Sequence, residues 1–285
     1  MAYIVHGATG AQGSPVLASL TTAGHTVVAA VRNPDAVADG VPAIAVDLAS
    51  ADSLASVYER TDGVFVHLPM GAPEAAAAQA RAVIEAVDRA RPGRVVISTS
   101  GQIVDQSDSP LQAAADSPIM TLIDGVSSSV PTAVVAPRLY LENLLLPVVL
   151  TPAREEGVLR YPLPASYPVS WSSHLDVADV VARLLTDASI TGTVAVGHRP
   201  GLTGPDLAVA FSTHLGREIS FEAITPEAFG DLITPLFGPA AEPVVDLYRA
   251  LNAQDGNTIA EGNSAQERLG LAPRPVKQWL EDLAV

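Results

Sequence analysis

Three glycines near the amino terminus are spaced as in loops that bind the phosphates of a dinucleotide. They are Gly7, Gly10 and Gly13. Residues 3–5 before them are apolar and residues 14–20 after them carry apolar side chains at helical spacing, which predicts a strand, a tight turn and a helix. In this arrangement Gly7 permits the turn, Gly10 lets a pyrophosphate approach the backbone and Gly13 lets the helix pack closely on the strand. Free N–H groups at the positive end of the helix would face the phosphates.

The end of the second expected strand indicates which dinucleotide binds. Residues 26–31 lead into Arg32, Asn33 and Pro34. A chain that binds NAD usually has Asp or Glu here to hold the ribose hydroxyls, whereas the planar fork of an arginine can hold the 2′-phosphate of NADP(H). The alternative is an arginine that lies in solvent at a strand end. Residues 1–50 therefore predict an NADP(H) site.

Three side chains outside the loop could donate the proton that accompanies hydride transfer. Tyr140 follows the sixth expected strand, His67 ends a buried strand on the expected nicotinamide side, and His174 precedes a helix. Histidine titrates near neutrality, which suits this role. Two of them have a structural alternative, because Tyr140 could be a packed aromatic residue and His174 a cap or core residue. Ser100 could hydrogen-bond a substrate carbonyl or only complete a loop.

Composition excludes several other classes of chemistry. The formal net charge of −15 argues against a nucleic-acid backbone or an anionic membrane as partner, since both repel an acidic surface. The chain has no cysteine, so a disulfide, a thiolate nucleophile and a cysteine-ligated metal are excluded. The histidines show no paired spacing of metal ligands, and no Gly-x-Ser-x-Gly segment occurs. We expect no metal and no serine hydrolase.

Alternating strand and helix signals predict a doubly wound parallel sheet of the Rossmann type, in the α/β class. The run from residue 63 to residue 68 is apolar on both faces, as in a parallel strand that helices cover on both sides. The expected strands are residues 3–6, 26–32, 42–46, 63–68, 94–98 and 132–136, and the main helices are residues 13–23, 74–90 and 118–126.

After residue 150 the alternation fades, and prolines at 162, 164 and 168 indicate an irregular segment. We expect an NADP(H)-binding domain over residues 1–150 and a smaller α/β substrate lobe over residues 151–285, with some strands returning to the main sheet. The amino terminus runs directly into the first strand, and no apolar run reaches the ~18 residues of a membrane span. We therefore expect a cytoplasmic protein without a signal peptide.

The order of five segments resembles the NmrA-like branch of the atypical short-chain dehydrogenases. The segments are residues 7–13, 31–34, 139–143, 174–179 and 201–208. The resemblance implies an NADP(H)-binding Rossmann domain with a small C-terminal lobe that closes over a cleft. Members of the family include NADPH-dependent quinone oxidoreductases, triphenylmethane dye reductases, isoflavone-reductase-like enzymes and regulators that sense redox state through the bound cofactor.

The resemblance also implies which residues contact the cofactor. They lie in the glycine loop and at the ends of the strands. Asp47 would lie near the adenine, or would only cap the helix that follows. Besides the three glycines, the implied contacts are Thr9, Gln12, Arg32, Asn33, Asp47, Leu68, Pro69, Thr99, Ser100, Pro137 and Tyr140.

The chain departs from the wider dehydrogenase family in its proton chemistry. Most short-chain dehydrogenases have a tyrosine four residues before a lysine that lowers the pKa of the phenol and holds the nicotinamide ribose. The single lysine here is Lys277, and Pro273 stands four residues before it. The helix expected after the fifth strand has no basic residue over residues 118–124 either. A Tyr-x-x-x-Lys pair is therefore absent from this sequence.

Three functions agree with these observations. The first is an NADPH-dependent reductase that acts on a small hydrophobic quinone or conjugated carbonyl, because such acceptors take up hydride and can collect protons from water. The second is an NADP(H)-binding redox sensor that has lost catalysis and acts through a protein partner. The third is a non-redox biosynthetic enzyme on the same fold. The sequence leaves the partner and the oligomeric state open.

Overall fold

A computed structural model describes residues 2–285 and divides the chain into two compact units. Unit 1 comprises Met1–Pro137, His174–Val196 and Glu261–Leu271. Unit 2 comprises Arg138–Ser173, Gly197–Ala260 and Ala272–Val285. The chain first passes from one unit to the other at residues 137–138, whereas we expected a boundary near residue 150, and each unit then recurs later in the sequence.

Unit 1 is built on a seven-stranded sheet in which every pair of neighbours is parallel. The strands follow the order β3-β2-β1-β4-β5-β6-β8. This is the doubly wound α/β sheet that the sequence predicts. The strands are β1 (Tyr3–His6), β2 (Val27–Val31), β3 (Ala43–Ala45), β4 (Gly63–His67), β5 (Val95–Ser98), β6 (Thr132–Pro137) and β8 (Gly192–Val196).

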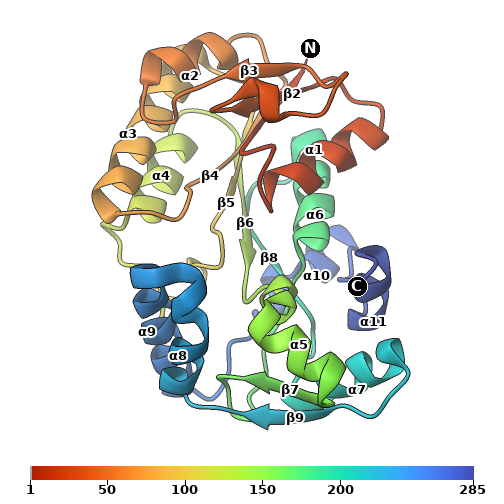
Figure 1. Ribbon diagram of the computed structural model, residues 1–285. Coiled ribbons are helices and arrows are strands. Elements are labelled where there is room, and N and C mark those ends of the chain that lie inside the picture. Colours follow the sequence, from red (N-terminus) through yellow and green to blue (C-terminus); the bar gives the residue numbers. More distant parts are fainter. Residues whose placement is uncertain (1) are drawn as a thin grey trace. The chain divides into compact units, whose positions relative to one another are not determined.

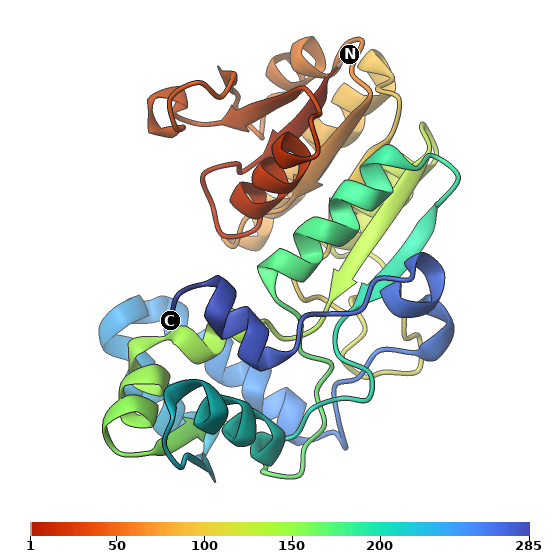
Figure 2. The ribbon, with the colours of Figure 1, turned by 90° about the vertical axis from the view of Figure 1, so that its right-hand side faces the viewer.

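Helices cover both faces of this sheet (Figure 1). On one face α2, α3 and α4 pack side by side, and on the other α1 packs against α6. Figure 2 shows α6 running along the strands beneath it. The helices of unit 1 are α1 (Gly13–Thr22), α2 (Ala51–Tyr58), α3 (Pro73–Ala90), α4 (Pro118–Ser127), α6 (His174–Thr186) and α10 (Ala265–Leu269), with the 3-10 turns η1 (Pro34–Ala36) and η4 (Glu261–Asn263).

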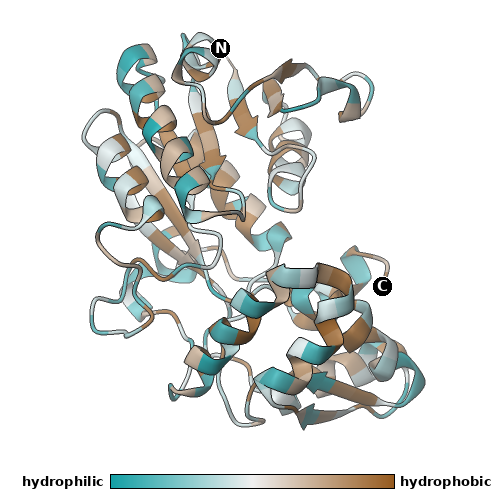
Figure 3. Ribbon diagram, turned by 60° about the vertical axis from the view of Figure 1, so that its left-hand side comes forward, coloured by the Kyte–Doolittle hydropathy of each residue, from teal (hydrophilic) through white to brown (hydrophobic). Residues whose placement is uncertain are grey.

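The middle strands form the core of unit 1. Val64, Phe65 and Val66 of β4 are each 0% exposed, so both faces of this strand are covered. Burying each such side chain stabilises the fold by about 1.5–3 kcal/mol. Figure 3 shows the strands in the brown of hydrophobic residues, with hydrophilic residues on the outer helices. The rigid centre of the sheet thereby holds the strand ends, from which the candidate site is built.

Unit 2 is organised around a two-stranded parallel sheet and an aromatic core. Tyr161 contacts Trp171, Phe229 and Tyr248, and the Tyr161 and Tyr248 hydroxyls share a buried hydrogen bond. Its strands are β7 (Val158–Tyr161) and β9 (Ser220–Ala223), and its helices are α5 (Pro147–Glu155), α7 (Gly204–Leu215), α8 (Pro226–Phe237), α9 (Ala241–Asn252) and α11 (Val276–Asp282), with the 3-10 turns η2 (Leu141–Leu145) and η3 (Gly238–Ala240).

Two elements of unit 2, helix α5 and strand β7, are not among the elements expected from the sequence. Helix α5 begins at Pro147, a position in the first turn where the missing N–H costs nothing. Strand β7 is defined by its pairing with β9 about sixty residues later, where Val158 lies opposite Ser220. Such long-range pairing leaves no local signal. Across residues 2–285, none of the helices combines the length and the apolar character that crossing a bilayer requires.

Candidate functional site

The glycine loop between β1 and α1 is a tight turn in which glycine is sterically required. Gly7 has φ +61°, a region that favours glycine. The Gly10 N–H donates to the Gly7 carbonyl at 2.8 Å. A Cβ on Gly13 would lie 2.2 Å from the Gly7 oxygen and 2.6 Å from the His6 oxygen. The loop and the first turn of α1 are therefore in direct backbone contact.

The amino-terminal end of α1 is suited to an anion. Gln12 precedes the helix, but its side chain makes no capping hydrogen bond, and the first turn has no acidic residue. The first N–H groups of a helix have no partner within it and carry the positive end of its dipole. Thr9 and Gly10 are exposed beside them. A loop with these properties can hold a phosphate group.

The order of the strands identifies where a ligand would lie in unit 1. The chain proceeds from β1 to β2 and β3 on one side of the sheet, and β4 and β5 follow on the other side of β1. In open α/β sheets, ligands bind at the carboxyl ends of the strands where this order reverses. Since all strands are parallel, the carboxyl ends place Gly7, Arg32, Leu68 and Thr99 along one edge.

The β2 and β3 side of this edge carries Arg32, Asn33 and Asp47. Their side chains differ in the hydrogen bonds they make. Arg32 is exposed, and within residues 2–285 its guanidinium has neither a hydrogen-bond nor an ion-pair partner. The Asn33 side chain accepts from the Asp35 N–H at 3.2 Å and caps η1. Asp47 accepts from the Ala49 N–H at 2.9 Å, and Ser50 rather than Asp47 caps α2. The Arg32 guanidinium is therefore available to bind a phosphate.

The loops after β4 and β5 contribute buried and polar groups. Leu68 is 8% exposed, whereas Pro69 is exposed. Thr99 is fully buried, and its hydroxyl has no hydrogen-bond partner in the part of the chain that the structure describes. A buried hydroxyl without a partner is costly, so a ligand that hydrogen-bonds Thr99 would relieve this cost. Pro137 ends β6 at the same edge.

Gln12, Ser98 and Ser100 form a closed set of hydrogen bonds across this edge. The Ser98 hydroxyl donates to Gln12 Oε1 at 2.8 Å, and Gln12 Nε2 donates to the Ser100 oxygen at 3.0 Å. The Ser100 N–H donates to the Ser98 oxygen at 3.2 Å. Sequence reasoning missed Ser98, although its place as the last residue of a strand beside Ser100 was the available signal.

His67 and His174 lie together in unit 1 and are held neutral. The His67 ring covers Gly7, because a Cβ there would lie 2.7 Å from His67 Nε2. Burial lowers the pKa of His67. Burial, with a smaller contribution from the charge of His67, lowers the pKa of His174 to about 4. Near neutral pH both imidazoles are uncharged, so neither stores an extra proton for a substrate.

A third histidine was missed by the sequence analysis. His6 ends β1, and its Nε2 lies 2.8 Å from the hydroxyl of Tyr58 on α2. Burial, and to a lesser extent the charge of His67, lowers the pKa of His6 to about 3. Burial also raises the pKa of Tyr58. The pair is a neutral, buried hydrogen bond that joins the residue before the glycine loop to α2.

Acid is expected to destabilise the protein through these histidines. The folded-state pKa values of His6 and His174 lie below the ordinary value near 6.5, so the unfolded chain binds more protons as the pH falls below 6.5. The free energy of unfolding should therefore decrease by roughly 1.4 kcal/mol per pH unit for each histidine. Urea denaturation between pH 6.5 and 5 measures the slope. In His174→Gln the free energy of unfolding should change less steeply with pH, by roughly the 1.4 kcal/mol per pH unit that one histidine contributes. An unchanged slope in this variant would contradict the prediction.

Tyr140 belongs to unit 2, whereas His67 and His174 belong to unit 1. Tyr140 forms an isolated bridge with Ser172, and the Leu141 N–H donates to the Ser172 carbonyl at 2.9 Å. Tyr140 is half-buried. The three candidate proton donors are thus divided between the two units, and only the two histidines lie together within one.

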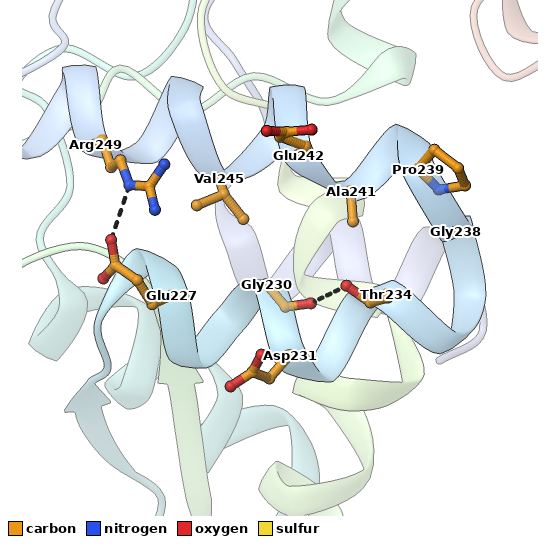
Figure 4. A pocket seen from close by; sticks show the side chains of 10 residues that line it. All are labelled: Glu227, Gly230, Asp231, Thr234, Gly238, Pro239, Ala241, Glu242, Val245 and Arg249. Carbon is orange, nitrogen blue, oxygen red and sulfur yellow. Dashed lines mark hydrogen bonds and ion pairs between the residues drawn. The ribbon is translucent and has the colours of Figure 1, made fainter.

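A separate pocket of about 330 Å³ lies between α8, η3 and α9 of unit 2 (Figure 4). Glu227 and Arg249 form an ion pair of 2.8 Å at one end, and the Thr234 hydroxyl donates to the Gly230 carbonyl at 2.7 Å. None of the residues expected at the site lines this pocket.

Within residues 2–285, no three carboxylate or imidazole side chains lie close enough together to hold a metal ion.

Solved structures with the same fold include two reductases and an epimerase. The NADP(H) complex of Citrobacter sp. triphenylmethane reductase has a TM-score of 0.82 at 19% identity, with 99% of each chain covered. The NADPH complex of an Escherichia coli NADPH-dependent quinone oxidoreductase has a TM-score of 0.77 at 19% identity over 100% of each chain. A Staphylococcus aureus nucleoside-diphosphate-sugar epimerase has a TM-score of 0.78 at 16% identity, covering 99% of this chain and 100% of that chain.

Comparison with curated protein sequences finds no significant match. A family model does match, and it spans almost the whole chain, from residue 3 to residue 279. This range includes the glycine loop, the whole seven-stranded sheet and most of unit 2. The protein belongs to the NmrA-like family.

Proposed function

We propose that this protein is an NADPH-dependent oxidoreductase that transfers hydride to a small hydrophobic quinone or conjugated carbonyl. The observation that carries this proposal is the carboxyl edge of the sheet in unit 1. There a sterically required glycine loop meets the uncapped end of α1, and the unpaired Arg32 lies at the end of the neighbouring strand. Among solved structures of the same fold, one is described as an NADPH-dependent quinone oxidoreductase and another as a reductase complexed with NADP(H), which supports the same cofactor here.

Each part of the edge would hold a different part of the cofactor. The loop N–H groups, with Thr9 and Gln12 beside them, bind the pyrophosphate, and Arg32 binds the 2′-phosphate through charge-assisted hydrogen bonds. Asn33 and Asp47 flank the adenosine half. On the other side Leu68, Pro69, Thr99, Ser100 and Pro137 of the same unit flank the nicotinamide half. When bound, NADPH supplies a hydride.

The side chains available for proton transfer favour hydride acceptors that do not require a proton donor from the protein. His67 and His174 are uncharged near neutrality, and Lys277 is engaged in an ion pair of 2.6 Å with Glu281 on α11 of unit 2. A quinone and NADPH with one proton give a hydroquinone and NADP⁺, and water can deliver that proton because the product anion is stable. A simple ketone requires a stronger donor. Of the three candidate donors, Tyr140 is the one that this neutrality does not exclude.

A redox sensor that binds NADP(H) without turnover is the second candidate. The observation in its favour is the absence of lysine from unit 1, since the chain's single lysine lies in unit 2. No lysine side chain of that unit can therefore hold the nicotinamide ribose. A sensor would act through a protein partner and would distinguish NADP⁺ from NADPH by binding alone.

The test is NADPH consumption by the purified protein with a panel of quinones, enones and simple ketones, with NADPH binding followed by fluorescence in parallel. We expect tight binding, and consumption with quinones or enones but not with simple ketones. Tight binding without consumption by any acceptor would contradict the reductase and support the sensor. Absence of NADPH binding would contradict both.

A further inference from the structure

The hydrogen bonds among Gln12, Ser98 and Ser100 have a defined direction. Ser98 is fully buried, and its oxygen already accepts from the Ser100 N–H. If the Gln12 amide were turned over, Ser98 would accept again and its own proton would lack a partner in a buried position, which is costly. With Oε1 toward Ser98, the buried Ser98 hydroxyl both donates and accepts a hydrogen bond within the set. Gln12 Nε2 must then donate to Ser100.

This direction makes Ser100 a hydrogen-bond donor. The Ser100 oxygen accepts the Gln12 amide proton, so its own O–H proton points away from the three-residue set. Ser100 is half-buried, whereas Ser98 is fully buried, so Ser100 carries the one hydroxyl of the set that a ligand can reach. Ser100 also has φ +53°, a conformation that is strained for serine and is found preferentially at functional sites.

The set also lies where the reacting groups would lie. Gln12 is in the loop after β1, and Ser98 and Ser100 are at the end of β5, with β4 between these two strands. The Gln12 side chain therefore spans the carboxyl end of β4, beside the point where the strand order reverses. The Gln12 side chain is uncharged, so it can orient a hydroxyl without repelling a phosphate.

We propose that Gln12 is a positioning residue that directs the Ser100 hydroxyl as a hydrogen-bond donor to the oxygen of the hydride acceptor. This inference rests on the proposed reductase function. When hydride from NADPH adds to a quinone or an enone, the acceptor oxygen gains the negative charge until water protonates it. A fixed donor at that oxygen stabilises the transition state, and losing one such donor typically lowers kcat by 10²–10³-fold.

Gln12→Glu tests the direction of the hydrogen bonds. The introduced carboxylate accepts from both serines, so it turns the Ser100 proton toward itself and away from the acceptor. We expect kcat at saturating NADPH to fall about 100-fold at pH 8. A protonated carboxyl again has one acceptor and one donor, as the amide has, so kcat should recover at least tenfold as the pH is lowered.

A readout that does not depend on turnover accompanies the activity. The pKa of the introduced carboxyl is measured by carbon-13 NMR in the protein without cofactor, and the recovery of kcat should have its midpoint at that pKa. Ser100→Ala should lower kcat by a similar factor without recovery in acid. The double variant should be no slower than Ser100→Ala, because both changes remove the same donor.

Gln102→Glu is the matched control. Gln102 is exposed two residues after Ser100, so this change adds the same charge nearby without touching the three-residue set, and kcat should show no acid recovery. If wild type reduces quinones but Gln12→Glu shows no acid recovery, the positioning role is wrong and the reductase stands. If wild type binds NADPH but reduces no acceptor, the proposed function fails and the role of Gln12 fails with it.

Discussion

Gly13→Ala is expected to abolish NADPH binding and to lower the free energy of unfolding by about 3 kcal/mol. The added Cβ would lie 2.2 Å from the Gly7 oxygen and 2.5 Å from the Gly7 carbonyl carbon. Both are backbone atoms, so no side chain can rotate to relieve the overlap. Either α1 must move away from β1 or the loop must open, and both changes separate the N–H groups that would bind the pyrophosphate.

Fluorescence titration with NADPH and urea denaturation measure the two effects of Gly13→Ala. Gly262→Ala is the matched control, since no atom lies within 4 Å of its added Cβ and the protein should bind NADPH as wild type does. Wild-type affinity for NADPH in Gly13→Ala would show that the loop is only a turn. Loss of binding at an unchanged free energy of unfolding would separate the binding role of the loop from its packing role.

Arg32→Asp is expected to weaken NADPH binding about 100-fold and to strengthen NADH binding. A hydrogen bond to a charged group contributes about 1.5–3 kcal/mol, and about 1.4 kcal/mol corresponds to a factor of ten in affinity. The loss of binding free energy should approach the upper end of this range, because Arg32 has no competing partner within residues 2–285. The introduced carboxylate repels the 2′-phosphate and can hold the ribose hydroxyls of NADH.

Dissociation constants for NADPH and NADH, measured at one fixed ionic strength, test this prediction. Arg81→Asp is a suitable control, because Arg81 is exposed on α3 and the substitution changes the net charge of unit 1 by the same amount. It should leave the ratio of the two constants unchanged. An NADPH affinity in Arg32→Asp equal to that of wild type would exclude Arg32 from the 2′-phosphate site.

Local signals determined the parts of the fold that the sequence predicted correctly. The strand, turn and helix around the glycine loop follow from glycine placement and from apolar residues that change from strand to helix spacing within about twenty positions. β4 was recognisable because a strand covered on both faces must be apolar on both, and Val64, Phe65 and Val66 are indeed fully buried. The parallel, doubly wound sheet follows from the alternation of such strands with helices.

Contacts between distant segments determined what the sequence analysis missed. His6 reaches Tyr58 fifty-two positions away, and Gln12 reaches Ser98 eighty-six positions away. Neither pair leaves a local pattern, because the order of the strands decides which strand ends become neighbours. The same reason explains β7, whose partner β9 follows only after α6, β8 and α7.

The sequence alone shows the fold class, the glycine loop, the charged residue at the end of β2 and the absence of a tyrosine–lysine pair. These properties depend on the type of residue at each position and on its near neighbours. The three-dimensional structure was needed to show that burial keeps His67 and His174 neutral and that they lie in a different unit from Tyr140. It was also needed to show that the Gln12 amide nitrogen donates to Ser100. Burial and hydrogen-bond direction depend on the whole surroundings of a side chain, and those surroundings exist only once the sheet has assembled.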